Sequence, residues 1–501
     1  MDHNLAEPAR PSDANTAPRC AVVDLGSNSV RLVVYEGRGR NPVAIFNEKA
    51  VLRLGKGLQN TGRLNEAGVA QALKVMVRYH VIARSMQAAP FEVLATAAVR
   101  DASNGAEFVE ALQARMPGAA IRILSGAEEA RLSAAGLGCG IADADGVLAD
   151  IGGGSLELVR LDRAGVRHAA TLRLGVIRLA DRADGDLDRA RDLADADLAT
   201  LPWLGDNSDG TLYLVGGAWR ALARVHMHHA RYPLNIVHYY TIDHDQARDL
   251  AQLVTVTGRL DKLLGAPRRR AEDLPYAGTV LRRLLRATNA RRIVFSAYGI
   301  REGWFLQSVP DAVRLQDPLL AAARADAERL SRDVALPPAL IGWTAPLFPY
   351  EPPHAARMRH AACWLSDTGS HDHPEYRAEL TFDRTLYTPG ALDHPTRAFL
   401  ALAMATRYEA EPDAPYLATA RALLDPVAIT RAELLGAALR LAYTLSAGTP
   451  DLLAGTAIRL EPGRVVLRLG GPGVFAGDGV QRRLDRLAAS LGLKAIVEEH
   501  P

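Results

Sequence analysis

Two short turns contain the residues best suited to chemistry. Residues 22–33 read VVDLGSNSVRLV and residues 148–159 read LADIGGGSLELV, with Asp, Gly, Ser, Leu and Val at matched positions. A glycine-rich turn between two strands can direct several backbone N–H groups to one point, and such a nest binds phosphate oxygens without a positive side chain. The candidate phosphate-binding residues are Gly26, Ser27, Asn28, Ser29, Gly152, Gly153, Gly154 and Ser155.

Carboxylates accompany both turns. Asp24 and Asp150 end the strands that lead into them, where carboxylates could hold a divalent cation or orient water beside a phosphate. Glu157 shares a strand face with Ser155 and could join a metal site, or it could be an outward polar residue. For either turn alone we favour a tight hairpin whose Asp accepts hydrogen bonds from its own turn. The presence of two such turns favours a phosphate-binding cleft between two related domains.

The segment SGAEEARL, residues 125–132, begins a predicted helix. Ser125 and Glu128 form a capping box, in which each side chain satisfies a backbone N–H at the helix start. Glu129 has no such structural role and could face the cleft as a base that activates water. The pattern alone favours the alternative, a solvated carboxylate at the positive end of the helix dipole.

Three further features could contact phosphate. Arg100 follows the strand FEVLAT and could bind a phosphate oxygen, although a surface salt bridge is the competing explanation. Gly216 and Gly217 end a strand before a helix, where an anion could approach the helix start. An arginine run at 268–270 could serve a long polyanion or could be a solvated face.

The elements that must position these residues alternate in type. Strands are predicted at 20–25, 30–36, 91–96 and 120–124, with helices at 65–87 and 105–115. A second round has strands at 146–151, 156–162, 211–217 and 291–297, with helices near 218–229 and 244–289. This alternation predicts an α/β fold with two similar halves.

The character of the chain changes at about residue 313. Ala, Leu and Arg then recur at helical spacing, and a hairpin at 456–469 has Pro-Gly at its turn. We therefore expect a disordered leader at 1–18, a first domain at 19–140 and a second at 141–312. A helical region with a small α/β tail is expected at 313–501.

Composition excludes several classes of protein. Among the 501 residues, 59 Lys and Arg against 57 Asp and Glu give a net charge of +2, so no strong field attracts nucleic acid or a membrane surface. The three cysteines form no C-x-x-C pair, and no stretch of about 18 apolar residues occurs. We expect a cytoplasmic protein with neither nucleic acid nor membrane as a partner.

Eight motifs in order give the chain a specific resemblance. They are VVDLGSNSVRLVVYE, LRLGKGL, TAAVRDASN, ILSGAEEARL, DIGGGSLELV, LRLGVIRL, YLVGGAWRALA and FSAYGIREG, within residues 20–305. The chain resembles the exopolyphosphatase and guanosine pentaphosphate phosphohydrolase (Ppx/GppA) family. This resemblance implies two ribonuclease H-like domains of the actin, Hsp70 and sugar kinase superfamily around a phosphate cleft.

The resemblance also implies roles for individual residues. Glu129 matches the catalytic base that activates water, and Arg100 matches an arginine beside the phosphates. Asp150 and Glu157 match acidic residues that serve Mg2+ and water, and with Asp24 they form the expected metal set. Another divalent cation, or K+, is an alternative. The two turns match the family's phosphate cradles.

The third region resembles the family's helical C-terminal portion, which is akin to metal-binding HD domains. In WLSDTG, Ser366 and Asp367 stand where an intact His-Asp pair would be, so a second hydrolytic centre is not expected. This region is instead expected to grip polymer and to form a homodimer.

The resemblance leaves the substrate open. We favour inorganic polyphosphate cut from its end with release of orthophosphate, because an arginine-rich second domain suits a linear polyanion. The alternatives are conversion of pppGpp to ppGpp, or a guanosine-polyphosphate sensor that catalyses little.

Overall fold

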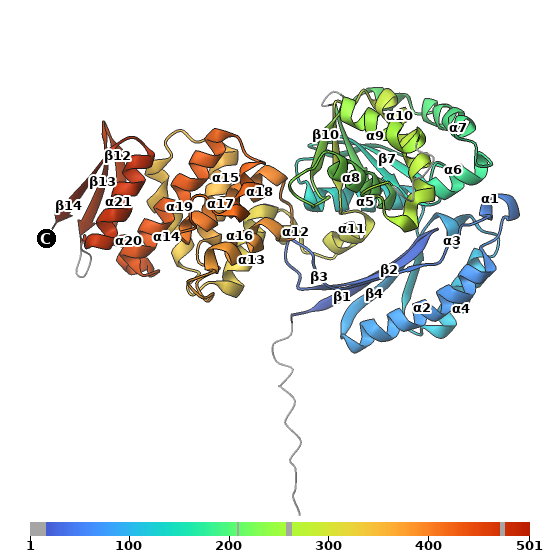
Figure 1. Ribbon diagram of the computed structural model, residues 1–501. Helices are drawn as coiled ribbons and strands as arrows, with labels where there is room; N and C mark the ends of the chain where they lie inside the picture. The colour runs from blue at the N-terminus through green and yellow to red at the C-terminus, as the bar shows by residue number, and fades with distance from the viewer. Residues whose placement is uncertain (1–16, 208–209, 257–262, 471–475, 501) are drawn as a thin grey trace, which may run out of the picture.

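Three parts make up the molecule (Figure 1). The computed structural model describes residues 17–207, 210–256, 263–470 and 476–500. Two α/β domains lie side by side, and a helical region with a small sheet at its far end adjoins them. Residues 1–16 of the expected leader lie outside the described residues. Within the described ranges, no helix is long and apolar enough to cross a bilayer.

The first sheet has the strand order β3-β2-β1-β4-β5. Its strands are β1 (Arg19–Leu25), β2 (Ser29–Glu36), β3 (Val43–Val51), β4 (Ala88–Ala95) and β5 (Ala120–Ile123). Strands β1, β2 and β3 are antiparallel, whereas β1, β4 and β5 are parallel. The domain's helices are α1 (Leu58–Thr61), α2 (Glu66–Ser85), α3 (Ala97–Asp101) and α4 (Gly105–Arg115).

The second sheet has the order β10-β11-β9-β6-β7-β8. Its strands are β6 (Gly146–Ile151), β7 (Leu156–Asp162), β8 (Gly165–Leu172), β9 (Thr211–Val215), β10 (Tyr240–Asp243) and β11 (Arg292–Ser296). Its helices are α6 (Val176–Arg182), α7 (Leu187–Ala199), α8 (Gly217–His229), α9 (His244–Val256) and α10 (Leu274–Thr288).

The two sheets repeat one topology. Strands β8-β7-β6-β9-β11 have the same order and the same pattern of antiparallel and parallel pairs as β3-β2-β1-β4-β5. The sequence repeat therefore corresponds to a repeat of structure, in which β1–β2 and β6–β7 are equivalent hairpins. The predicted fold class, two ribonuclease H-like α/β domains, is confirmed.

Two helices connect the halves by crossing between them. Helix α5 (Gly126–Gly140) follows β5 of the first sheet but packs its buried residues, among them Ala130 and Leu137, against the second sheet. Helix α11 (Ile300–Gln307) follows β11 of the second sheet but packs Trp304 and Phe305 against the first. The predicted division after residue 140 thus falls at the end of a helix that belongs to the second core by its packing.

The helical region holds the largest hydrophobic core. Its helices are α12 (Asp311–Arg314), α13 (Pro318–Leu330), α14 (Leu336–Thr344), α15 (Pro353–Leu365), α16 (Arg377–Tyr387), α17 (His394–Arg407), α18 (Ala418–Arg421), α19 (Pro426–Ser446) and α20 (Pro450–Ala454). The tail adds β12 (Thr456–Glu461), β13 (Arg464–Gly470), α21 (Asp478–Ser490) and β14 (Lys494–His500). A helical region that ends in a small α/β unit was expected and is confirmed.

Glycines allow α5 and α11 to cross closely. A Cβ atom on Gly136 would lie 1.9 Å from the carbonyl oxygen of Gly299, whereas one on Gly138 would meet nothing within 4 Å.

We expect Gly136→Ala to lower the free energy of unfolding by about 1–3 kcal/mol, because the helices must separate to admit the methyl group. Gly138→Ala, on the same helix, should raise it by about 0.5–1 kcal/mol. Denaturant unfolding of both variants checks this, and equal effects would contradict the crossing.

Candidate active site

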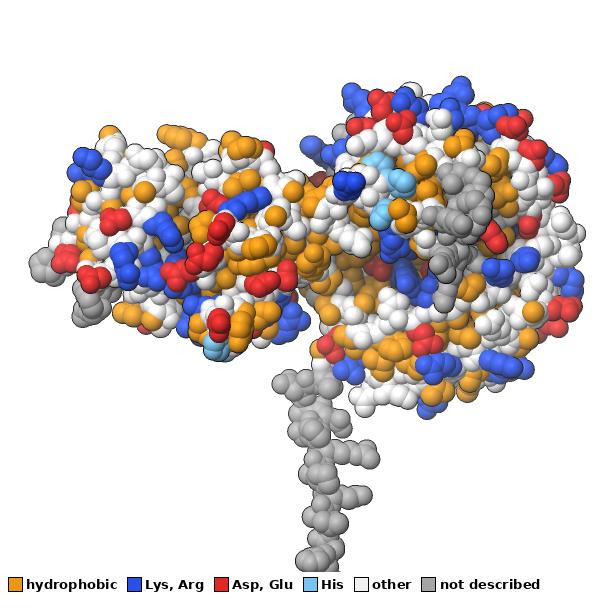
Figure 2. All heavy atoms as spheres, viewed as in Figure 1, with side chains coloured by type: hydrophobic (Ala, Val, Ile, Leu, Met, Phe, Trp, Pro, Cys, Tyr) orange, Lys and Arg blue, Asp and Glu red, His pale blue; other side chains and the backbone are white. Residues whose placement is uncertain are grey.

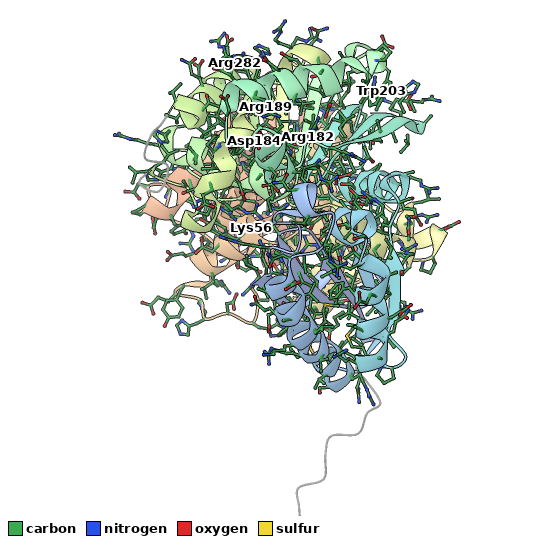
Figure 3. All side chains as sticks on the ribbon, turned by 90° about the vertical axis from the view of Figure 1, so that its right-hand side faces the viewer. Lys56, Arg182, Asp184, Arg189, Trp203 and Arg282 are labelled. Carbon is green, nitrogen blue, oxygen red and sulfur yellow. The ribbon has the colours of Figure 1, made fainter. Side chains whose placement is uncertain are left out.

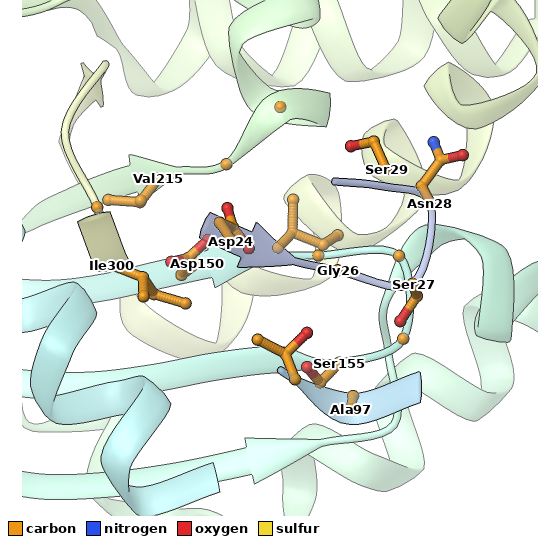
Figure 4. A pocket seen from close by; sticks show the side chains of 18 of the residues that line it. Asp24, Gly26, Ser27, Asn28, Ser29, Ala97, Asp150, Ser155, Val215 and Ile300 are labelled. Atoms are coloured by element: carbon orange, nitrogen blue, oxygen red, sulfur yellow. The ribbon is translucent and has the colours of Figure 1, made fainter. Parts of the chain in front are cut away.

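The two predicted turns face each other across the domain boundary (Figure 4). Each is closed by the same hydrogen bond, since Gly26 N donates to Ser29 O at 3.1 Å and Gly152 N donates to Ser155 O at 3.0 Å. A Cβ atom on Gly154 would lie 2.7 Å from the hydroxyl oxygen of Ser27, and one on Gly153 would lie 3.5 Å from Asn28 N, so the two turns are in close contact. The cleft inferred from the repeated motif is therefore present.

A cavity of about 150 Å3 lies between the turns. All the predicted site residues line it except Arg100, and basic side chains are visible in the hollow between the two domains (Figure 2). The predicted residues that line it are Asp24, Gly26, Ser27, Asn28, Ser29, Glu129, Asp150, Gly152, Gly153, Gly154, Ser155, Glu157, Gly216 and Gly217. With the other lining residues, nine separate segments of the described chain converge on one small volume.

Asp24 and Asp150 occupy equivalent positions at the ends of β1 and β6, near one another in the cavity (Figure 4). The Ser133 hydroxyl donates a hydrogen bond to Asp150 Oδ2, and the Arg301 guanidinium lies 3.8 Å from Asp24 Oδ2. Burial raises the pKa of both carboxyl groups; the charge of Asp24 raises the pKa of Asp150 further, and that of Glu302 raises the pKa of Asp24.

Glu129 is buried, with only 3% of its surface exposed. The capping box is confirmed, because Ser125 and Glu128 exchange the expected hydrogen bonds and leave Glu129 to face inward. Burial raises the pKa of Glu129 to about 7; Asp150 and Asp24 also raise it, against the opposing effect of Arg100. The alternative that Glu129 is a solvated carboxylate is wrong, because α5 packs on the second sheet.

Arg100 lies behind Glu129 rather than on the cavity wall. Its Nη1 group donates to the Glu129 carboxylate and, at 2.8 Å, to Leu124 O, while Nε contacts Asp101 at 3.2 Å. In this structure Arg100 therefore fixes the orientation of Glu129.

Glu157 is also buried, with 3% exposure, so the alternative of an outward polar residue is wrong. Burial, then the negative charges of Glu129 and Asp150, raise its pKa well above the usual range. Its Oε1 atom has no hydrogen-bond partner among the described residues.

The Gly-Gly pair after β9 permits a close approach. Gly216 has φ +119°, and a Cβ atom there would lie 2.4 Å from Ile151 O and 3.1 Å from Asp150 Oδ1. A Cβ atom on Gly217 would lie 2.4 Å from the Arg270 side chain. No larger residue fits at either position without displacing the cavity wall.

Five basic residues that were not predicted as site residues also line the cavity: Arg31, Lys49, Arg220, Arg270 and Arg301. Burial, then the guanidinium groups of Arg301 and Arg31, lower the pKa of Arg220 to about 9. An anion bound here would relieve that repulsion. Arg31, Arg220 and Arg301 lie inside the motifs that carry the family resemblance, so their positions could have indicated them as site residues. Lys49 lies on edge strand β3, which the sequence pattern did not predict.

The acidic residues suit a metal ion whose coordination shell is completed by oxygens of a phosphate ligand. The described residues contain no group of three or more His, Cys, Asp or Glu side chains that could hold a metal ion by themselves. Mg2+ is commonly bound by one or two carboxylates together with substrate phosphates and water. Buried carboxylates with raised pKa values, and the unpartnered Oε1 of Glu157, fit such a site.

Comparison with known proteins decides the family. Residues 33–312 match the model of the Ppx/GppA phosphatase family, and residues 319–497 match that of the exopolyphosphatase C-terminal domain. The chain belongs to the Ppx/GppA phosphatase family.

The similarity of this Ppx/GppA chain to individual relatives is distant. Exopolyphosphatase 2 of Mycobacterium tuberculosis is 33% identical over 174 residues, which are 33% of this chain and 54% of that protein. The chain thus matches about half the length of that relative. Exopolyphosphatase 1 of Mycobacterium bovis is 27% identical over 313 residues, 58% of this chain and 88% of that protein. A crystal structure of an exopolyphosphatase from Cytophaga hutchinsonii shares the fold, with a TM-score of 0.53, 22% identity and coverage of 58% of this chain and 99% of that one.

Because the pKa of Glu129 is raised, we expect the stability of this Ppx/GppA protein to depend on pH. A carboxyl whose folded pKa lies above its unfolded value stabilises the fold at low pH, and this contribution is lost as pH rises through the folded pKa. Without metal, Glu129→Gln should therefore exceed the wild type in stability above about pH 7, by on the order of 3 kcal/mol, and match it near pH 4.

Glu128→Gln is the matched control on the neighbouring residue. Hydrogen bonds from the Ser125 backbone and hydroxyl lower the pKa of Glu128, so its stabilisation is present at neutral pH and is lost as pH falls. This variant should be less stable than the wild type at pH 7. Thermal unfolding in EDTA across pH measures both, and the same sign for the two variants at pH 8 would contradict the burial of Glu129.

Proposed function

We propose that this Ppx/GppA family member hydrolyses the terminal phosphoanhydride bond of inorganic polyphosphate and releases orthophosphate. The observation that carries the proposal is a buried glutamate, Glu129, in a cavity enclosed by two glycine-rich turns. The names of the two mycobacterial relatives, both exopolyphosphatases, support the substrate.

The turns would bind the terminal phosphoryl group. The backbone N–H groups of Gly153 and Gly154 in one turn, and of Ser27 and Asn28 in the other, have no hydrogen-bond acceptor among the described residues. N–H donors of this kind neutralise the charge that spreads over equatorial oxygens during phosphoryl transfer. Arg220 and Arg301 add positive charge at the same cavity. The site is therefore suited to a phosphoryl group that gains charge on its oxygens.

Glu129 would act as the base. A carboxylate with a pKa of about 7 takes a proton from water more readily than an ordinary glutamate does, because its conjugate acid is weaker. The water oxygen forms a bond to the terminal phosphorus, the bond from that phosphorus to the bridging oxygen breaks, and the proton passes to the Glu129 carboxylate. Arg100 would hold that carboxylate in place.

One or two of the carboxylates of Asp24, Asp150 and Glu157, together with phosphate oxygens of the substrate, would hold the divalent cation, for which we propose Mg2+. When bound, this ion supplies Lewis-acid stabilisation of phosphate oxygens. The surroundings of these carboxyl groups raise their pKa values, so their ionised forms are unfavourable without a countercharge. A bound cation would supply that countercharge and would displace any proton that the carboxyl groups hold.

A groove beside the cavity supports a substrate longer than one phosphate. It has a volume of about 850 Å3 and shares Asn28, Lys49, Val176 and Arg270 with the cavity. It continues past Arg53 and Lys56 on the first domain and opposite Asp181 and Gly185 on the second. In the side view Lys56 lies below Arg182 and Asp184 of the second domain (Figure 3). A linear polyanion could extend from the cavity along this groove.

One observation favours the alternative substrate. Tyr276 and Pro275 also line the groove, and an aromatic ring beside a phosphate site can stack a purine base. Hydrolysis of pppGpp to ppGpp, or binding of such nucleotides with little catalysis, is therefore the second candidate.

The predicted arginine run at 268–270 is described only in part. The side chains of Arg268 and Arg269 lie outside the described part of the chain, whereas Arg270 lines both the cavity and the groove. A homodimer and a cytoplasmic location stay predictions.

Glu129→Gln should lower orthophosphate release from long-chain polyphosphate by about 10²–10⁴-fold, because the loss of a general base costs that much. The assay compares release from polyphosphate and from pppGpp, each with Mg2+ and with EDTA. Glu128→Gln should retain the wild-type rate. Retention of activity by Glu129→Gln would show that Glu129 is not the base. Faster turnover of pppGpp than of polyphosphate by the wild type would favour pppGpp as the substrate.

Lys56→Gln should raise KM for long-chain polyphosphate about two- to fivefold with little change in kcat, since Lys56 is an exposed cation of the groove and touches no reacting group. Lys74→Gln on α2, which also removes one exposed lysine outside the groove, should leave KM unchanged. Equal KM values for both variants would show that the chain leaves the cavity by another path.

A further inference from the structure

The helical region contains a second basic cavity, far from the turns along the chain. It has a volume of about 440 Å3 and is lined by the side chains of five arginines: Arg332, Arg377, Arg407, Arg440 and Arg483. These come from four helices, α16, α17, α19 and α21, and from the segment after α13. The cavity is therefore built by tertiary packing, not by a local run of charge.

Carboxylates neutralise only part of this charge. Asp367 binds Arg332, with Oδ1 2.8 Å from Nη2, and Glu409 binds both Arg440 and Arg483. Two carboxylates against five guanidinium groups leave a surplus of three positive charges. Asp367 lies in WLSDTG, where the family resemblance indicates that the metal-binding His-Asp pair is not intact. In the structure Asp367 instead forms an ion pair with Arg332.

Arg407 and Arg377 have no acidic partner among the described residues. Arg407 is 3% exposed, its side chain forms no hydrogen bond within the described chain, and its Nε atom is buried without an acceptor. Its Cζ lies 3.7 Å from the ring centre of Tyr443 and 4.5 Å from that of Tyr408. Arg377 also contacts an aromatic ring, with Cζ 5.3 Å from the Tyr408 ring centre, and its Nε atom is likewise buried without an acceptor.

Such an arrangement needs an anion. Burial of an unpaired guanidinium is costly, and contacts with aromatic faces offset only part of that cost. Stacking on Tyr408 and Tyr443 also fixes the planes of the guanidinium groups, which suits bidentate contacts with phosphate oxygens.

We propose that this cavity is a second binding site, for a multivalent phosphoanion of the pyrophosphate type. The three surplus charges match a ligand with several negative oxygens better than they match a single chloride or carboxylate. The ligand could be a free diphosphate or an internal segment of a polyphosphate chain, which present the same oxygens. The site lies in the helical region and does not depend on catalysis at Glu129.

Hydrogen–deuterium exchange of the full chain in EDTA tests this site. The probes are methylenediphosphonate, a diphosphate that cannot be hydrolysed, and long-chain polyphosphate, with sulfate as a single-anion control. We expect either phosphate probe to slow amide exchange at the start of α16, the end of α17 and the middle of α19. If methylenediphosphonate slows amide exchange, the site binds a free diphosphate. If only polyphosphate slows it, the site binds an internal segment of a polyphosphate chain.

Arg377→Gln should weaken this protection about tenfold or more in ligand concentration, because it removes a charge-assisted contact from a half-exposed position. Arg482→Gln removes an exposed arginine next to Arg483 that does not line the cavity, and it should leave the protection within twofold of the wild type. Protection at the catalytic turns should be the same in both variants. No protection of these helices by either probe, equal protection by sulfate, or an unchanged response of Arg377→Gln would overturn the proposal.

Discussion

The structure depends on four carboxylates gathered in one small cleft, three of them, Glu129, Asp150 and Glu157, buried. Like charges placed together away from water repel each other, so their pKa values rise and the folded state becomes less stable at neutral pH. The arrangement persists because Ser133, Arg100 and Arg301 each contact one of the acids, and because the close crossing of α5 and α11 links the two sheets. A phosphate ligand with a cation would supply the countercharge that the protein alone does not.

Duplication explains how so few motifs build this cleft. The same strand, turn and strand occur once in each domain, and each turn is closed by the same backbone hydrogen bond. Two equivalent turns that face each other enclose an anion from opposite sides, which neither could do alone. The exchange of α5 and α11 between the sheets then brings Glu129 to the boundary, since α5 begins at an edge of one sheet and packs on the other.

Much of this arrangement could be predicted from sequence, for identifiable reasons. The turns, Asp24, Asp150 and the distinct positions of Glu128 and Glu129 follow from local patterns that the structure reproduces. The burial of Glu129 could not be predicted, because it results from packing of α5 on a sheet formed by later residues. Edge strands β3 and β8 were missed because most of their residues are exposed and show no buried alternation. Arg31, Arg220 and Arg301 lie within the conspicuous motifs, whereas Lys49 and Arg270 lie outside them on separate elements, so no motif indicated these two as site residues.

The central claim, that buried Glu129 activates water between the two turns, is tested most directly by the pH dependence of kcat for orthophosphate release from polyphosphate at saturating Mg2+. The account predicts that kcat rises with pH to a plateau as the Glu129 carboxyl loses its proton. Because Arg100 lowers the pKa of Glu129, Arg100→Gln should move the midpoint to higher pH. A rate that is flat from about pH 5 to about pH 9, or a midpoint that Arg100→Gln leaves in place, would contradict the account.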